Sequence, residues 1–407
     1  MKETQIIPGL FKSESGKIIA VLTKYLGIAH LQVAEDIAGE TFLAALETWP
    51  YKGVPEFPVA WLYTVAKNKA KNHLKHEQTF SNKVVDEVKR TTEDSVEPDF
   101  DWSGQLISDS QLQMLFAICH PSLPMESQIG LALRILCGFG IEEIANAFLT
   151  NKEAINKRLF RAKEKLREEK VELVFPSTID IPKRLDAVLT TLYLLFNEGY
   201  YSESHESVLR DDLCQEAMRL TSMLIENELT NVPEANALLA LMYFHASRFP
   251  ARKNVNATLI LYDDQDETLW NQAFISKGAF HLHQASQGNR LSKYHLEAGI
   301  AYWHTKKEDT HEKWENILQL YNKLLQLAYS PIAALNRTYA LSKANGKEEA
   351  IREAEKLQLN DNPYYHTLLG VLYKEINPTK STAYFEKALS VANTDADRKA
   401  IAFHIQS

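Results

Sequence analysis

Apolar residues recur at intervals of three and four along most of the chain, and runs that alternate apolar with polar residues are nearly absent. This spacing places the apolar side chains on one face of a helix, so the sequence predicts an all-α fold. Residues 256–262 alone have the pattern of a short strand. Glycine and proline cluster between the periodic segments, as at 49–55 and 120–124, where we expect turns.

The same pattern divides the 407 residues into several parts, as expected for a chain too long for one ordinary core. Residues 1–77 and 108–172 form two small helical blocks, and residues 183–407 form a long succession of amphipathic helices. Residues 78–107, between the blocks, are acidic and weakly periodic. Like charges at this density oppose packing, so we predict a linker there.

The last part of the chain has the marks of a helical repeat. A helix containing Gly370 and Tyr373 is followed by one containing Tyr384 and Ala388, which resembles the tetratricopeptide pattern. Helix pairs of this kind stack into a curved solenoid with a concave surface. We therefore expect residues 183–407 to form a tetratricopeptide-like domain that could take a protein or small-molecule effector.

A helix-turn-helix pattern spans residues 140–169. The first helix would bury Ile141, Ile144, Ala145 and Phe148, and the second would bury Ile155, Leu159, Ala162 and Leu166. Asn151 stands where it can cap the second helix. The opposite face of that helix carries long polar donors: Lys152, Asn156, Lys157, Arg158, Arg161 and Lys163. A DNA-recognition helix needs one apolar face that packs on the protein and one polar, basic face that reaches the DNA. An ordinary surface helix whose lysines are only solvated has the same two faces.

The distribution of charge along the chain also favours DNA binding. The formal net charge is -8, yet two basic clusters stand out, one at 67–75 and one at 152–167. Contacts to phosphates require local positive charge on one face and do not require a basic average.

Other chemistry is not indicated. The cysteines, Cys119, Cys137 and Cys214, lie far apart, which suits reduced, buried side chains. His281 and His283, two apart on a helix, point to different faces, and no catalytic or phosphate-binding motif is present. We expect no enzyme, no metal and no cofactor. The N-terminus has no export signal and no segment could span a membrane, so we expect a cytoplasmic protein without membrane contact.

Several stretches resemble a known family. The segment 141–145 followed by 157–163 resembles the minus-thirty-five-reading domain of bacterial ECF-type RNA polymerase sigma factors. Residues 34–42 resemble the core-polymerase-binding helix of that family, and residues 61–68 resemble its minus-ten-reading segment. Residues 185–200, 209–217 and 264–266 are similar to the subgroup with a tetratricopeptide-like extension.

The resemblance implies a protein that directs core RNA polymerase to specific promoters and is modulated by its extension. It places core-polymerase contacts on Glu35, Asp36 and Glu40. It places minus-ten promoter contacts on Tyr51, Lys52, Lys67, Asn68, Lys71, Asn72 and Lys75. It places minus-thirty-five contacts on Lys152, Asn156, Lys157, Arg158, Arg161 and Lys163. Trp61 is expected to anchor the core.

Alternatives stay open at this point. In the family the linker follows the RNA exit path of the polymerase, where its acidic residues could stand in for RNA, but a plain tether has the same composition. The chain could also be a one-component helix-turn-helix regulator that binds duplex DNA alone, with its repeat domain binding a ligand or protein. Least favoured is a repeat scaffold with a vestigial helix-turn-helix.

Overall fold

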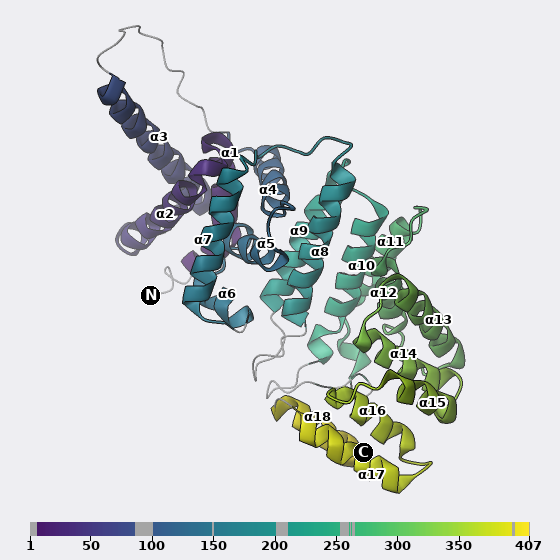
Figure 1. Cartoon of the computed structure of the whole chain (residues 1–407). Helices are drawn as coiled ribbons and strands as arrows, with labels where there is room; N and C mark the ends of the chain where they lie inside the picture. The colour runs from purple at the N-terminus through teal and green to yellow at the C-terminus, as the bar shows by residue number, and fades with distance from the viewer. Residues whose placement is uncertain are drawn as a thin grey trace. The chain divides into compact units, whose positions relative to one another are not determined.

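Figure 1 shows a computed structural model of the chain, which describes residues 6–85, 101–148, 150–200, 211–252, 260, 262, 265–392 and 395–406. These residues form helices and turns, and no strand occurs among them. The predicted all-α fold is confirmed. The strand expected at 256–262 lies largely outside the described residues. The helices fall into two compact units, one formed by α1 to α9 and the other by α10 to α18.

The first unit contains nine α-helices and two short helical turns in its described residues. They are α1 (Ile6–Leu26), η2 (Ile28–His30), α2 (Leu31–Lys52), α3 (Pro58–Val85), α4 (Gly104–Ile118), α5 (Met125–Leu131), the π-helical turn η3 (Ala132–Leu136), α6 (Ile141–Ala147), α7 (Lys152–Glu168), α8 (Ile181–Tyr200) and α9 (Asp211–Glu226).

Helices α1, α2 and α3 pack together around a buried apolar core. Trp49 of α2 and Trp61 of α3 meet edge to face, with ring centroids 5.4 Å apart. This contact joins the two helices, as expected of Trp61. Helix α2 ends at Gly53, whose φ of 80° lies in the left-handed region that glycine adopts without strain.

Helical structure extends into both ends of the linker expected at residues 78–107. Helix α3 continues through residues 78–85, since no glycine or proline interrupts it, and α4 begins at Gly104 with Ser103 as its cap. Residues 86–100, which hold most of the acidic side chains, lie outside the described residues.

Helix α1 also packs against α4 and η3, which belong to the second block. At Gly16 a Cβ atom would lie 2.5 Å from the carbonyl oxygen of Leu136 and 2.9 Å from that of Ile135. Only glycine fits at this distance from a backbone. The first and second blocks therefore share a tightly packed interface.

Helices α8 and α9 belong to the first unit, although residues 183–407 were expected to form one domain. Arg184 of α8 donates a hydrogen bond to the carbonyl oxygen of Phe116 in α4. Thr191 of α8 donates to Oε1 of Gln128 in α5 at 3.2 Å. The apolar stripes of α8 and α9 are buried, so these two helices complete the core that α4 and α5 begin.

The second unit is a succession of helices in which each packs on the next (Figure 1). They are α10 (Pro233–Ser247), the short turns η4 (Phe249–Ala251) and η6 (Glu267–Leu269), α11 (Gln272–Ala285), α12 (Lys293–Trp303), α13 (His311–Leu327), α14 (Pro331–Ala344), α15 (Lys347–Leu357), α16 (Pro363–Tyr373), α17 (Pro378–Val391) and α18 (Asp395–Gln406).

In the pair α16 and α17, small residues allow the two helices to pack closely. A Cβ atom at Gly370 would lie 2.9 Å from the ring of Phe385, so the absence of a side chain lets the two helices approach closely. Ala388 on α17 is fully buried beside them. This arrangement agrees with the spacing of small and aromatic residues in the sequence.

Candidate nucleic-acid interface

Helices α6 and α7 build the first candidate surface. Asn151 accepts a hydrogen bond from the backbone N–H of Ala154 at 2.8 Å and so caps α7 as expected. All four predicted core positions of α7 are buried: Ile155, Leu159, Ala162 and Leu166. In α6, Ile144 and Ala145 are buried as well, whereas Ile141 and Phe148 are half-buried.

The outward face of α7 is polar and basic. Lys152, Asn156, Lys157 and Arg161 are exposed. Lys152 forms an exposed ion pair with Glu142 of α6 at 3.0 Å. Such a pair adds little stability, so its lysine can be redirected at little cost.

Arg158 is half-buried, and its guanidinium lies over the ring of Phe148, 5.3 Å from the centroid. This cation–π contact joins α7 to the turn before it. Its Nη1 atom is buried without a hydrogen-bond partner. Arg158 thus helps to hold the two helices at a fixed angle.

One exposed aromatic residue of α7 is not among the contact residues predicted from the sequence. Phe160 is 65% exposed and stands between Lys157 and Arg161. Phe160 falls outside the buried stripe that contains Leu159 and Ala162. The helical spacing of the sequence therefore already predicts that its ring is exposed. An aromatic ring among cations suits contact with a thymine methyl or a sugar.

Lys163 does not lie on the exposed face with the others. Its ammonium group forms an ion pair with Glu35 of α2 and donates a hydrogen bond to Oε1 of Gln32 at 3.0 Å. Only 18% of the lysine side chain is exposed. The structure therefore joins a residue expected to contact DNA to one expected to contact polymerase.

The three acidic residues of α2 are placed differently. Glu35 is buried, with 6% of its side chain exposed, and also pairs with Nε of Arg134 at 3.4 Å. Asp36 is exposed and accepts a hydrogen bond from Gln32 at 3.0 Å. Glu40 is exposed and pairs with Lys69 of α3 at 2.7 Å. Asp36 and Glu40 are thus open to a partner, and Glu35 is covered.

Helix α3 builds the second candidate surface. Leu62, Ala66 and Ala70 are fully buried and face α1 and α2. The opposite face presents the exposed side chains of Asn68, Asn72 and Lys75, and the flanking Lys67 and Lys71 are half-buried. The structure thus gathers the expected residues of this helix on one polar, basic face.

The loop between α2 and α3 adds exposed aromatic surface. Tyr51 is 89% exposed at the end of α2, and Lys52 beside it is also exposed. Phe57, just before α3, is exposed too and was not singled out from the sequence. Exposed rings beside cations are the surfaces on which unstacked bases rest.

The chain returns to α3 after the acidic segment. The ring of Trp102 stacks on Tyr63 of α3, with centroids 4.7 Å apart and an angle of 16° between the planes. The Tyr63 hydroxyl donates to Oε2 of the buried Glu14 at 2.6 Å. Burial, together with this carboxylate, raises the pKa of Tyr63, so its hydroxyl stays a donor. The end of the linker is therefore fixed next to the second candidate surface.

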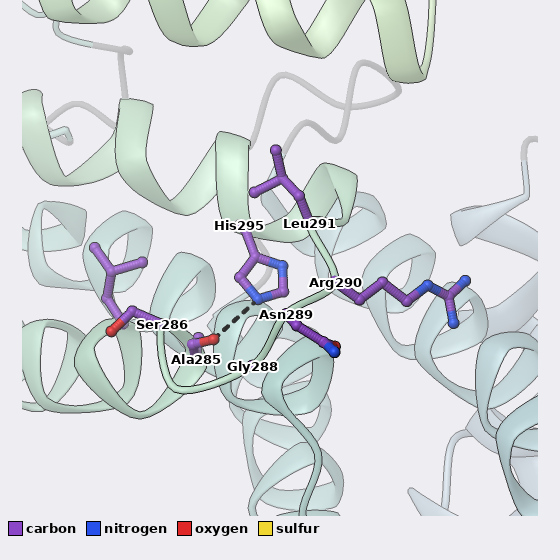
Figure 2. A pocket seen from close by; sticks show the side chains of 8 residues that line it. Ala285, Ser286, Gly288, Asn289, Arg290, Leu291 and His295 are labelled. Atoms are coloured by element: carbon purple, nitrogen blue, oxygen red, sulfur yellow. Dashed lines mark hydrogen bonds between the residues drawn. The ribbon is translucent and has the colours of Figure 1, made fainter.

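In the second unit, a shallow pocket lies at the turn between α11 and α12 (Figure 2). His295 lines it, but Nε2 of this histidine lies 3.3 Å from the carbonyl oxygen of Ala285, and Nδ1 lies 2.7 Å from the Ser292 hydroxyl. Burial lowers the pKa of His295, so the ring is neutral near pH 7. Both ring nitrogens therefore make polar contacts within the turn between α11 and α12, and the histidine has a structural role.

The cysteines Cys119, Cys137 and Cys214 are free, and all three are buried as predicted. His281 bonds to Asn236 through Nδ1 at 2.9 Å. Among the described residues, no group of three or more histidine, cysteine or acidic side chains could hold a metal ion. No helix in the described part of the chain has the length and apolar character needed to cross a bilayer.

Comparisons with known proteins agree with the geometry of the first unit. Residues 10–80, which contain most of α1, all of α2 and most of α3, match the family model described as sigma-70 region 2. Residues 184–286 match a family of unknown function, DUF6596. No solved structure matches the chain.

Two curated proteins are similar to the chain. An uncharacterized protein of Rhizobium meliloti (strain 1021) is 32% identical over 402 residues, which cover 98% of this chain and 94% of that protein. The RNA polymerase sigma-H factor of Pseudomonas aeruginosa is 26% identical over 152 residues, which cover 36% of this chain and 77% of the factor. The chain therefore belongs to the same family as the Rhizobium protein, and its residues 10–80 are a sigma-70 region 2, which supports a sigma-factor-like role in transcription initiation.

Proposed function

We propose that the protein is an ECF-type sigma factor that directs core RNA polymerase to specific promoters. The observation that carries the proposal is the presence of two separate basic faces, on α3 and α7, in the first unit of an acidic chain. A regulator that binds duplex DNA alone needs only α7. A protein that also opens the duplex needs a second surface for unstacked bases, which α3 and the exposed Tyr51 supply.

In this proposal α7 enters the major groove at the minus-thirty-five element. Asn156 and Arg161 reach base edges, while Lys152 and Lys157 neutralise phosphates. Arg158 holds α7 against the turn through Phe148. Lys163 becomes available to DNA only when its pairing with Glu35 is released.

The minus-ten element is bound by the polar face of α3. Asn68 and Asn72 have amide groups that can bond to the edges of unstacked bases, and Lys67, Lys71 and Lys75 flank them with positive charge. Tyr51 and Lys52 contact the same single strand from the preceding loop. Asp36 and Glu40, exposed on α2, meet the basic surface of core polymerase.

We also propose that the C-terminal extension modulates this activity and that its helices from α10 onward form a tetratricopeptide-like domain. The support is the sequential packing of paired helices and the close approach at Gly370. Such a domain offers a surface for a protein or small-molecule effector.

Transcript start mapping in cells that produce the protein tests the proposed function. We expect new start sites that share two upstream elements at one fixed spacing. Production of the Arg161→Ala variant should reduce these starts, and production of Lys183→Ala, at an exposed lysine of α8 that belongs to neither face, should not. New starts that share no upstream element would contradict the proposal, and tight specific binding of duplex DNA without polymerase would favour a one-component regulator.

A further inference from the structure

Tyr262, in the second unit, is surrounded by positively charged side chains. The guanidinium of Arg248, which follows α10, lies over its ring, with Cζ 5.4 Å from the centroid. The ammonium groups of Lys307 and Lys313 lie 5.2 Å and 5.1 Å from the same centroid. Arg248 and Lys313 are buried, with 8% and 1% of each residue exposed. Three cations are thus gathered around one ring, where like charges are poorly screened by water.

The two lysines donate hydrogen bonds to neutral oxygens. Lys313 donates to the Tyr262 hydroxyl at 3.0 Å and to the carbonyl oxygen of Lys306 at 2.6 Å. Lys307 donates to the carbonyl oxygens of Tyr262 at 2.9 Å and of Gln265 at 3.1 Å. Neutral partners hold the ammonium groups in place but do not cancel their charge, and the burial of charge is costly. The surroundings of the ring therefore suit a negative group.

Two further polar groups adjoin the same ring. The rings of Trp270 and Tyr262 have centroids 6.2 Å apart, and His304 meets Tyr262 edge to face at 5.2 Å. Nε1 of Trp270 and Nδ1 of His304 are buried and have no hydrogen-bond partner among the described residues. A buried N–H group without an acceptor destabilises a fold, so most such groups have one. An acceptor placed here would satisfy both.

Two histidines show that the local field is positive. Burial, together with the charges of Arg248 and Lys313, lowers the pKa of His304 to about 3. Burial lowers the pKa of His245 as well, and Arg248 and Arg252 add to the effect. Both rings are therefore neutral near pH 7, and Nδ1 of His304 can carry the ring proton and donate it. The charge that disfavours a proton on these rings favours an anion beside them.

Acidic residues of the chain are the rivals of an external anion. Asp309 pairs with Lys343 at 3.1 Å, and 59% of its side chain is exposed, so it lies toward solvent. Asp263 and Asp264 follow Tyr262 in the sequence and lie outside the described residues. Substitution of these two aspartates separates a carboxylate of the chain from a bound ligand.

We propose that the groups around Tyr262 form a binding site for the phosphate group of a small molecule. The inference deepens the proposed effector role of the C-terminal extension and rests on it for any effect on transcription. A phosphate group brings three acceptor oxygens and up to about two negative charges, whereas a carboxylate brings two oxygens and one charge. Phosphate therefore matches three cations and two N–H groups more closely. A macromolecular surface does not fit, because Arg248 and Lys313 are buried.

Access to the site requires local movement. Nε1 of Trp270 and Nδ1 of His304 are closed off from solvent, so a ligand reaches them only when the chain around Tyr262 opens. We therefore expect slow association. A ligand that binds the folded state alone raises the free energy of unfolding, so the bound phosphate should stabilise the second unit.

Thermal melts and titration calorimetry of the full-length protein with inorganic phosphate test the site. Potassium phosphate is compared with potassium chloride and potassium acetate at equal ionic strength and pH. We expect phosphate to raise the melting temperature with a saturable dependence on concentration, and calorimetry to give one site for each chain. Acetate that stabilises the protein as well as phosphate does would overturn the assignment to phosphate.

Two substitutions locate the binding. Lys313→Met removes one cation and should weaken phosphate binding by about tenfold or more, since a charge-assisted hydrogen bond is lost. Trp270→Phe keeps an aromatic ring and removes an N–H group that has no partner in the free protein. It should weaken phosphate binding without lowering the melting temperature in chloride. The controls are Lys323→Met, at an exposed lysine of the same helix as Lys313, and Trp303→Phe, at the end of α12. Both should bind phosphate like the unchanged protein.

Three outcomes would overturn the site. The first is the absence of a saturable phosphate effect on the unchanged protein. The second is a phosphate effect that appears only when Asp263→Asn and Asp264→Asn are combined, because the chain's own carboxylates then fill the site. The third is phosphate binding that persists in both Lys313→Met and Trp270→Phe proteins that are folded by circular dichroism. No measurement uses polymerase or promoter DNA, so failure of the site leaves the sigma-factor proposal intact, and the reverse also holds.

Discussion

Glu35 of α2 and Lys163 of α7 form an ion pair across the interface between the two helical blocks of the first unit. The family resemblance assigns the first to a polymerase contact and the second to a DNA contact. Their pairing means that the two surfaces are not independent in this structure. The remaining exposed residues of each surface are the ones whose roles can be tested first.

Replacement of Arg161 by alanine should weaken promoter binding by about tenfold or more, because an arginine that reaches a base edge contributes roughly 1–3 kcal/mol of discrimination. Lys157→Ala should instead lower affinity for all sequences and reduce the slope of log affinity against log salt by about 0.9. Titration of labelled promoter with the polymerase complex at several salt concentrations measures both. Equal effects of the two variants on specific and unrelated DNA would contradict the assignment of Arg161.

On α3, Asn68→Ala should impair opening of the promoter and leave binding of the closed duplex nearly unchanged, because unstacked bases are available only after melting. Reactivity of exposed thymines to permanganate measures the opening. Thr64→Ala is the control, since Thr64 is exposed one turn earlier and its hydroxyl donates to the Ala60 carbonyl at 2.8 Å within the helix. A loss of opening as large in Thr64→Ala as in Asn68→Ala would remove the specific role of the asparagine.

The stability of the first unit should depend on whether a truncated protein retains α8 and α9. A protein of residues 1–230 keeps α8 and α9 and should unfold cooperatively on heating. A protein of residues 1–175 lacks Val188, Leu192 and Phe196, all fully buried, and each such side chain contributes about 1.5–3 kcal/mol on burial. We expect the shorter protein to melt at a lower temperature by circular dichroism. Equal melting temperatures would show that α8 and α9 are dispensable for the core.

Acid should destabilise the second unit through His304. Burial, together with the nearby charges of Arg248 and Lys313, lowers the pKa of His304 to about 3, whereas the unfolded chain has an ordinary histidine pKa near 6.5. The unfolded state thus binds the proton more readily between these values. Stability is full above about pH 6.5 and falls as the pH drops, by roughly 1.4 kcal/mol for each pH unit attributable to this group.

Thermal melts between pH 7.5 and pH 5 measure this loss. The variant His304→Phe keeps an aromatic ring beside Tyr262 and Trp314 and removes the proton-binding nitrogen, so it should show a weaker pH dependence. His283→Phe, at an exposed position of α11, should behave like the unchanged protein. A pH dependence that His304→Phe does not alter would assign the effect to another group.

The sequence pattern anticipates features that depend on one helix at a time. The buried stripe from Ile155 to Leu166, the Asn151 cap and the exposed face of α3 all follow from helical spacing and local hydrogen bonding. Phe160 could have been recognised in the same way. Features of this kind need no knowledge of what the helix packs against.

The pattern does not anticipate features that depend on a distant partner. Lys163 has the same chemical character as Lys157, and only the position of α2 decides that it meets Glu35. The apolar stripe of α8 predicts burial but does not name the surface that buries it, so the division after residue 182 differs from the compact units. The fit of Gly16 to η3 likewise depends on residues more than a hundred positions away.

Run-off transcription with purified core polymerase tests whether the protein is a sigma factor. The template carries a promoter identified by start mapping, and the reactions contain core polymerase alone, with the protein, or with its Arg161→Ala or Asn68→Ala variant. We expect a strong, defined transcript with the unchanged protein, a weaker one with each variant, and none with core polymerase alone. The absence of a transcript from core polymerase and the unchanged protein, on a promoter that the protein activates in cells, would contradict the proposal that it is a sigma factor.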